Sequence, residues 1–154
     1  QSYAELVGRV DAGEVRDLEH WCREVSQAPL RFEPGTRWEY SYGVDVVGHV
    51  IEVVSGLPLG EFLQREILGP LGMVDTGFGV PEAKQCRLAS FYRRHEEDDS
   101  ETSTLQCVDR AGAESRWVEP GQSRIPSAGG TIGSIAGGLV STMNDFTRLC
   151  LMIA

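Results

Sequence analysis

Apolar residues in the middle of the chain recur every three or four positions, which is the spacing of an amphipathic helix. This apolar stripe consists of Val44, Val47, Val50, Ile51 and Val54. Ser41 stands where an N-cap is expected, Asp45 supplies a carboxylate in the first turn, and Gly56 suits a left-handed stop. The pattern therefore predicts a helix that begins after Ser41 and ends at Gly56.

A second helix follows without a long connection. Leu57-Pro58 opens it, because proline suits the first helical turn, and Gly69-Pro70 ends it. Its apolar stripe is Leu59, Phe62, Leu63 and Ile67. Upstream, Pro34-Gly35 predicts a turn, and the alternation from Arg37 to Tyr40 predicts a short extended segment.

Three further helices are predicted near the ends of the chain. The first spans Ser2 to Asp11, and the second spans Glu14 to Gln27, before Pro29. Ser141 is expected to cap the last helix, with Asp145 in its first turn. The apolar stripes are Leu6, Val7 and Val10 in the first helix; Val15, Leu18, Trp21, Cys22 and Val25 in the second; and Phe146, Leu149, Cys150 and Ile153 in the last.

Between these helical regions the pattern favours short strands. The ranges are Arg87 to Arg94, Leu105 to Arg110 and Ser115 to Val118. The charged run His95 to Glu101 is expected to be a solvated loop tip, since it lacks the glycine and ligand spacing of a calcium loop. Helices and a few antiparallel strands together predict an α+β protein.

Two stretches resemble the serine β-lactamase-like and penicillin-binding-protein-like hydrolases, in particular the class C lactamase and carboxylesterase branch. The first is PGTRWEYS with the two helices after it, through PLGEFLQREILGPLGMVDTGF. The second is SAGGTIGSIAGGLVSTMNDFTRLCLMI, which is similar to the family's Gly-rich stretch and the helix after it. The matches cover about half of the chain, in the family's order.

The resemblance implies the largely helical region of a β-lactamase-like fold, with a few short antiparallel strands and an incomplete main sheet. The chain is then a single partial domain. Its parts are expected to be leading helices over 1–33, the Tyr-Ser-Tyr core with two helices over 34–78, short strands and the acidic loop over 79–126, and the Gly-rich loop with the final helix over 127–154.

The chain departs from the family's motifs in two ways. Tyr42 stands where the family has an asparagine, whose amide can both donate and accept; this favours an esterase-like relative over a β-lactamase. The nucleophilic Ser-Xaa-Xaa-Lys pair is also absent, because the single lysine, Lys84, has Pro81 three residues before it. No Lys/His-Thr/Ser-Gly motif occurs either. We therefore expect these 154 residues to be an internal segment of a longer protein, not catalytically competent alone.

Tyr40 is the candidate catalytic residue that the resemblance implies, because the family's tyrosine sits beside the nucleophilic serine. A free phenol, with a pKa of about 10, is a poor base at neutral pH, but a neighbouring ammonium favours its phenolate. From the residues alone, Tyr40 is better interpreted as an aromatic side chain at a strand–helix junction, and the match around it reverses that preference. Ser41 is better explained as a helix cap than as a nucleophile. Tyr42 is a weaker candidate for an acyl or alcohol pocket, and Gly130 for the border of the cleft.

Composition and motifs exclude several other classes of function. A net charge of −9 argues against nucleic acid and anionic membranes as partners. The four cysteines form no Cys-Xaa-Xaa-Cys pair, so no metal site is expected, and the absence of phosphate-loop and dinucleotide motifs predicts no cofactor. The uncharged run Ile125 to Asn144 is too rich in glycine and hydroxyl residues for a membrane span. These features leave the compartment unknown.

Three functional hypotheses remain open. The chain is part of a serine hydrolase that acts on a small ester or amide; or it is a non-catalytic subunit of a larger assembly; or it is a module that binds a small ligand without turnover. In the first two, the remainder of the protein or a partner chain covers apolar surface that this segment exposes. The isolated segment is then expected to aggregate.

Overall fold

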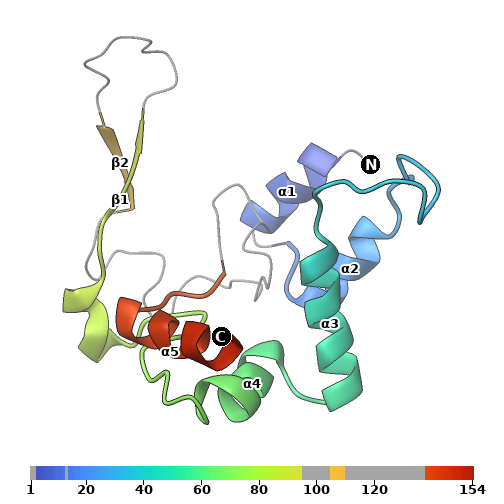
Figure 1. Ribbon diagram of the computed structural model, residues 1–154. Coiled ribbons are helices and arrows are strands. Elements are labelled where there is room, and N and C mark those ends of the chain that lie inside the picture. Colours follow the sequence, from blue (N-terminus) through green and yellow to red (C-terminus); the bar gives the residue numbers. More distant parts are fainter. Residues whose placement is uncertain (1–2, 13, 95–104, 110–137) are drawn as a thin grey trace. The chain divides into compact units, whose positions relative to one another are not determined.

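The computed structural model describes residues 3–12, 14–94, 105–109 and 138–154 (Figure 1). The chain divides into two compact units. One comprises Gln1–Phe78 with Ser123–Ala154, and the other comprises Gly79–Gln122. The described part is mainly helical and contains one two-stranded antiparallel sheet, in agreement with the predicted α+β class.

The first unit begins with helices α1 (Tyr3–Asp11) and α2 (Leu18–Val25), which contact each other. The carboxylate of Asp17 accepts a hydrogen bond from the backbone N–H of His20 at 2.7 Å and so caps α2. The prediction that this helix begins at Glu14 was therefore wrong by one turn. The start of the helix is set by the Asp17 side chain, three residues before the N–H that it accepts, and apolar spacing alone does not reveal the position of such a cap.

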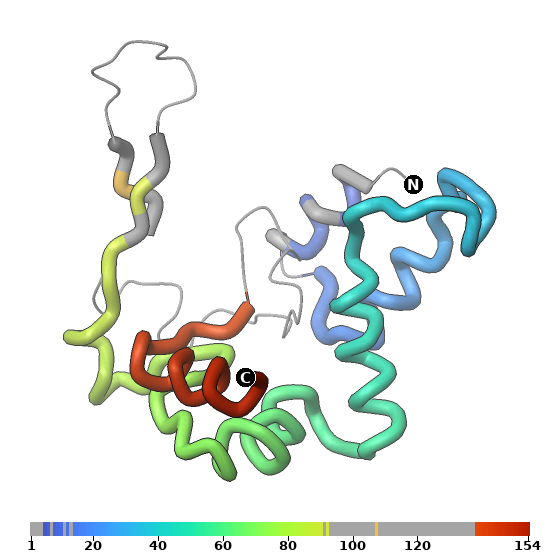
Figure 2. Tube along the Cα trace, in the orientation of Figure 1, coloured from blue at the N-terminus to red at the C-terminus, as the bar shows by residue number. Residues whose placement is uncertain are grey.

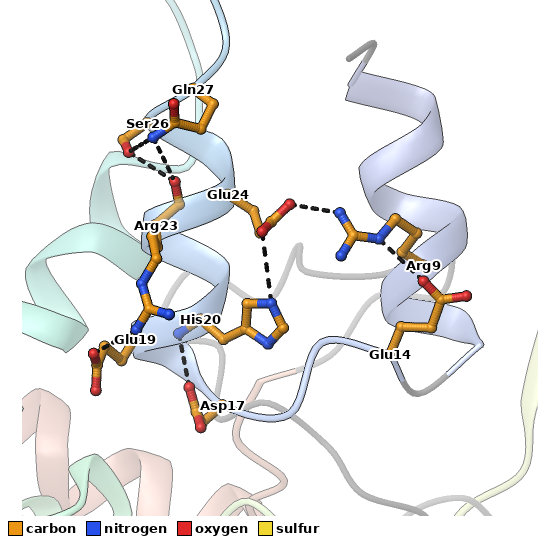
Figure 3. Close-up of polar contacts among 9 residues, drawn as sticks. All are labelled: Arg9, Glu14, Asp17, Glu19, His20, Arg23, Glu24, Ser26 and Gln27. Carbon is orange, nitrogen blue, oxygen red and sulfur yellow. Dashed lines mark hydrogen bonds and ion pairs between the residues drawn. The ribbon is translucent and has the colours of Figure 1, made fainter.

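Charged side chains on α1 and α2 connect the two helices (Figure 3). The guanidinium of Arg9 donates to Glu24 at 2.5 Å and to Glu14 at 3.1 Å. The imidazole of His20 lies 3.6 Å from the other oxygen of Glu24, four residues along the same helix. His20 is half-buried at this position.

The apolar stripe predicted for the helix over Glu14 to Gln27 forms the centre of the core. Its members pack with residues of α1 and of α4 (Leu59–Leu63): the buried side chains are Leu6, Val15, Leu18, Trp21 and Leu59. Trp21 has no exposed surface, while Cys22 and Val25 are partly buried against this cluster. Burying side chains of this size stabilises the fold by about 1.5–3 kcal/mol each.

Helix α3 (Gly43–Ser55) confirms the helix predicted after Ser41 and its end at Gly56. Gly56 has φ 70°, and its N–H donates to the Glu52 carbonyl. The N-cap position is Tyr42, with no side-chain cap hydrogen bond, so the prediction that Ser41 caps this helix was wrong. Ser41 lies one residue too early to reach the free N–H groups of the first turn.

The apolar face of an amphipathic helix is usually buried, but in α3 it is largely exposed. Asp45 and Gly48 are its buried residues, and the helix packs against α2 and α4. Most of the predicted apolar stripe is instead exposed: Val44 57%, Val47 55%, Val50 52% and Val54 81%, with Val46 and Val53 also exposed. We call these six residues the valine face. The valine face thus leaves apolar side chains exposed along one side of α3.

The second predicted helix is present but changes its hydrogen bonding halfway. Helix α4 (Leu59–Leu63) continues as a π-helical segment, η1 (Gln64–Leu68), which ends as the N–H of Gly69 donates to the Gln64 carbonyl at 2.8 Å. Among the described residues no single helix is long and apolar enough to cross a membrane. Within the same described residues, one pair of helices, Gly43–Ser55 and Leu59–Leu68, meets the length and composition criteria when the two are taken together, but the pair is bent.

Helix α5 (Met143–Ile153) lies against the loop that follows η1, as the red and green segments of Figure 2 show. Its N-cap is Thr142, whose hydroxyl accepts from the Asp145 N–H at 3.2 Å, so the prediction of Ser141 as the cap was wrong by one residue. Gly77 and Val140 form a bridge of two backbone hydrogen bonds, 3.0 and 2.8 Å long. The predicted stripe of α5 is largely exposed, including Phe146, Cys150 and Ile153.

The second unit contains a short 3₁₀ helix, η2 (Glu82–Arg87), and strands β1 (Phe91–Arg94) and β2 (Leu105–Asp109), which pair antiparallel. The strand predicted from Arg87 thus begins four residues later, and the strand predicted from Leu105 is confirmed. The range Ser115 to Val118 and the acidic run His95 to Glu101 lie outside the described residues.

Candidate functional site

A loop over residues 30–40 carries the predicted catalytic tyrosine, and its two limbs contact each other at three successive levels. At the tip, the backbone N–H and the hydroxyl of Thr36 both donate to the Glu33 carbonyl, at 3.2 and 2.6 Å, while Gly35 adopts φ 83°. Further down, the Arg37 guanidinium lies 5.3 Å from the centre of the Phe32 ring. At the base, Arg31 forms an ion pair with Glu39. We call this segment the aromatic loop.

The ascending limb of the loop is residues 30–33 and the descending limb is residues 36–40. These contacts place alternate side chains of the descending limb on opposite sides. Arg37 and Glu39 contact the ascending limb, whereas Trp38 and Tyr40 are 84% and 73% exposed. The predicted Arg37 to Tyr40 segment forms no strand, but its polar and aromatic positions do alternate in this way. The phenol of Tyr40 is therefore presented to the exterior by a loop whose limbs are held together.

Tyr40 and Tyr42 occupy different environments although only Ser41 separates them. Tyr42 is half-buried, and its ring packs against Trp21 with centroids 5.3 Å apart and planes tilted by 59°. Burial raises the pKa of the Tyr42 phenol, and the nearby negative charge of Asp45 raises it further. Tyr42 thus remains a neutral phenol at neutral pH, anchored to the core just before α3.

Gly130, the third predicted site residue, lies outside the described residues, and Ser41, expected only as a helix cap, is exposed. Tyr40 and Tyr42 thus both lie just before α3, but only Tyr40 is exposed to solvent over most of its surface. A phenol at such a position can accept and return a proton once a cation lies beside it. Lys84 is half-buried and belongs to the other unit.

Ionisable side chains also meet where α2 packs on α3. Burial raises the pKa of the Cys22 thiol, and the charges of Asp45 and Glu52 raise it further. Glu52 accepts the backbone N–H of Leu59 at 2.9 Å, and its other oxygen lies 3.6 Å from Nδ1 of His49. Within the described ranges, no group of three or more histidine, cysteine or acidic side chains could hold a metal ion.

The sequence did not predict the environment of two residues of the first unit. The first is Trp38, which is exposed because its neighbours Arg37 and Glu39 contact the other limb of the aromatic loop. The alternation of polar and aromatic residues from Arg37 to Tyr40 could have predicted this exposure. The second is Asp145, which is 1% exposed and was expected only to complement the helix dipole. Its carboxylate accepts from the Asp75 N–H at 2.7 Å and from the Thr76 hydroxyl at 2.9 Å.

Comparison with known proteins places these features in a family. The family model described as "Beta-lactamase" matches residues 4–154. Protein Rv1367c of Mycobacterium tuberculosis is 37% identical over 90 residues, which is 58% of this chain and 22% of that protein. Esterase EstB of Burkholderia gladioli is 39% identical over 86 residues, which is 54% of this chain and 22% of the esterase. The chain thus spans less than a quarter of the length of either relative.

A solved structure agrees with this assignment. EstCE1, described as a hydrolase with promiscuous acyltransferase activity, superposes with a TM-score of 0.63 at 27% identity. The superposition covers 86% of this chain and 34% of EstCE1. The tyrosine segment, the two helices after it and the final helix are thus part of one matched region, and the chain belongs to the β-lactamase family of serine hydrolases.

Proposed function

We propose that this chain supplies the tyrosine of an ester-hydrolysing active site, with Tyr40 as its proton-transfer residue. The observation that carries this proposal is the 73% exposure of Tyr40 on the aromatic loop, directly before α3. A tyrosine that served only as core packing would be buried as Tyr42 is, against Trp21. The similarity to an esterase of Burkholderia gladioli supports the same assignment.

The chemistry follows from the acid–base properties of a phenol. As a phenolate, held in that form by an adjacent ammonium, Tyr40 takes the proton of a serine hydroxyl while the serine oxygen attacks the ester carbonyl. The phenol then returns this proton to the departing alcohol as the C–O bond breaks, which leaves an acyl-enzyme. Water releases the acid in a second, equivalent step. Tyr40 thus acts as a base and then as an acid within each half of the reaction.

The serine and the lysine come, in this proposal, from polypeptide outside residues 1–154. Within the printed sequence the only lysine is Lys84, and no Ser-Xaa-Xaa-Lys pair occurs. We further propose that residues 1–154 form part of one β-lactamase-related domain whose main sheet is completed by other polypeptide, and that the valine face of α3 is covered in the process. The exposure of that face supports this, since it is wide and apolar.

The substrate class that we propose is a small ester, with amides as poorer substrates. Tyr42 stands in place of an asparagine amide and is packed on Trp21. A phenol has one hydroxyl and cannot reproduce an amide's separate donor and acceptor groups. Recognition of a substrate amide at that position is therefore weaker. Tyr42 is proposed to border the acyl or alcohol pocket, and Gly130 to border the cleft.

The test is Tyr40→Phe in the complete protein that contains this chain, with p-nitrophenyl acetate as the probe. Loss of a positioned acid–base group lowers kcat by about 10²–10⁴-fold, with a smaller effect on KM. The matched control is Tyr92→Phe, which removes the hydroxyl of another exposed tyrosine, on β1. If Tyr40→Phe retains the activity of Tyr92→Phe, Tyr40 is not the proton-transfer residue and the proposal is wrong.

A further inference from the structure

Among the described residues of the first unit, Trp38 has the most exposed aromatic side chain, at 84%. It lies two residues before Tyr40, on the limb of the aromatic loop from which Arg37 and Glu39 contact the other limb. Trp38 and Tyr40 therefore share the outward side of this limb. Where a chain is extended it advances about 3.3 Å per residue, so the two side chains start within about 7 Å of each other.

The loop fixes the backbone that presents these two rings. The turn at Glu33–Thr36, the contact of Arg37 with Phe32 and the ion pair of Arg31 with Glu39 join the limbs without using Trp38. The indole thus contributes to none of the described contacts that hold the loop. Tryptophan offers a wide apolar surface with few rotatable bonds, and such side chains anchor ligands at low entropic cost.

We propose that Trp38 is a specificity-determining residue that contacts the apolar acyl group of the ester. This rests on the proposed function, because it places the reacting carbonyl at Tyr40. An apolar group several carbons long, extending from that carbonyl along the limb, reaches the indole, whereas an acetyl group does not. The protein is therefore selective for esters of longer chains over acetate, and Trp38 is the origin of that selectivity.

The experiment compares Trp38→Ala and Trp38→Phe in the complete protein, with p-nitrophenyl acetate and p-nitrophenyl octanoate as the two probes. We expect Trp38→Ala to lower kcat/KM for the octanoate by about 10–100-fold, mainly through KM, and to change the acetate value by less than about threefold. Trp38→Phe restores most of the octanoate activity, since an aromatic surface is kept. The matched control is Leu30→Ala, which removes a 75% exposed side chain from the other limb and leaves both values unchanged.

Equal losses on both esters, together with a lower Tm, would show that Trp38 is covered by other polypeptide and would overturn the proposal. Unchanged selectivity in Trp38→Ala would overturn it as well. Tyr40→Phe separates this inference from the proposed function. If that variant loses activity on both esters while Trp38→Ala keeps wild-type selectivity, only the role of Trp38 is wrong. If Tyr40→Phe remains active, the catalytic assignment itself is wrong.

Discussion

At the scale of single residues, Asp145 shows how one carboxylate joins distant parts of the sequence. It is 1% exposed, and it accepts hydrogen bonds from the N–H of Asp75 and the hydroxyl of Thr76, 70 and 69 residues away. The Thr76 hydroxyl also lies 2.8 Å from that of Ser141. A buried carboxylate with such partners fixes the start of α5 against the preceding loop.

We predict that Asp145→Ala lowers the free energy of unfolding of the complete protein by about 2–4 kcal/mol, because it leaves buried donors without an acceptor. Asp145→Asn keeps one acceptor oxygen and loses less. Urea denaturation measures both. Asn144→Ala, at the exposed neighbouring position, is the control and should change stability by less than about 0.5 kcal/mol. An Asp145→Ala variant as stable as this control would contradict the role assigned to the carboxylate.

At the scale of elements, the contact between α1 and α2 depends on pH through Glu24. The hydrogen bond from Arg9 lowers the pKa of Glu24, and the positive charge of Arg9 acts in the same direction. A carboxyl group whose pKa is lower in the folded state stabilises the fold above its unfolded pKa, about 4.3 for glutamate, and this contribution is lost as the pH falls through the folded value.

We therefore predict that the Tm difference between wild type and Glu24→Gln is present at pH 7 and shrinks as the pH falls from 5 to 3. Thermal melts of the complete protein over this range measure it. Glu61→Gln, on the exposed surface of α4, controls for the loss of one negative charge. A difference that stays constant across the range would mean that the Arg9–Glu24 contact is not formed in solution.

The valine face of α3 gives a second prediction at this scale. If other polypeptide covers it, Val50→Asp buries a charge and destabilises the complete protein by at least about 3 kcal/mol. In the isolated 154-residue chain the same substitution reduces exposed apolar surface and increases solubility. The control is Asn144→Asp, which adds the same charge at an exposed position of α5. If Val50→Asp leaves the stability of the complete protein unchanged, this face is not covered.

The elements themselves were largely predictable, but their ends and faces were not. The spacing of Leu18 and Trp21 identified the buried face of α2, and Gly56 marked the end of α3. The caps were assigned one residue early at both Ser41 and Ser141. Such a cap needs a side-chain oxygen that can accept a hydrogen bond, but whether that oxygen reaches a particular N–H depends on local backbone geometry that composition does not encode.

The candidate site was predictable only in part for a related reason. The motif around Tyr40 made this residue the candidate, but the loop that exposes it is held by contacts of Arg31 with Glu39 and of Phe32 with Arg37 across a turn. Such cross-limb pairs have no periodic signature in a sequence. For α3, periodicity identified the apolar side correctly but could not show that the described residues leave it uncovered.

At the scale of the whole molecule, the exposed faces of α3 and α5 give a prediction for residues 1–154 alone. The isolated chain should aggregate, or bind a dye for exposed apolar surface such as ANS, because Met143, Phe146, Leu151 and the valine face are all open to solvent. Light scattering and dye fluorescence measure this, with the complete protein as the control. A sharp two-state melt of a monomeric isolated chain would contradict the prediction.

The bridge between Gly77 and Val140 has a consequence for how such proteins vary. Its two backbone hydrogen bonds join the residue at which the intervening stretch of chain begins, Gly77, to the residue at which it ends, Val140, just before α5. Whatever length of polypeptide lies between these two points, the helix beyond it is anchored in the same place. Evolution can therefore lengthen, shorten or exchange that intervening stretch without changing how α5 is attached to the loop after η1.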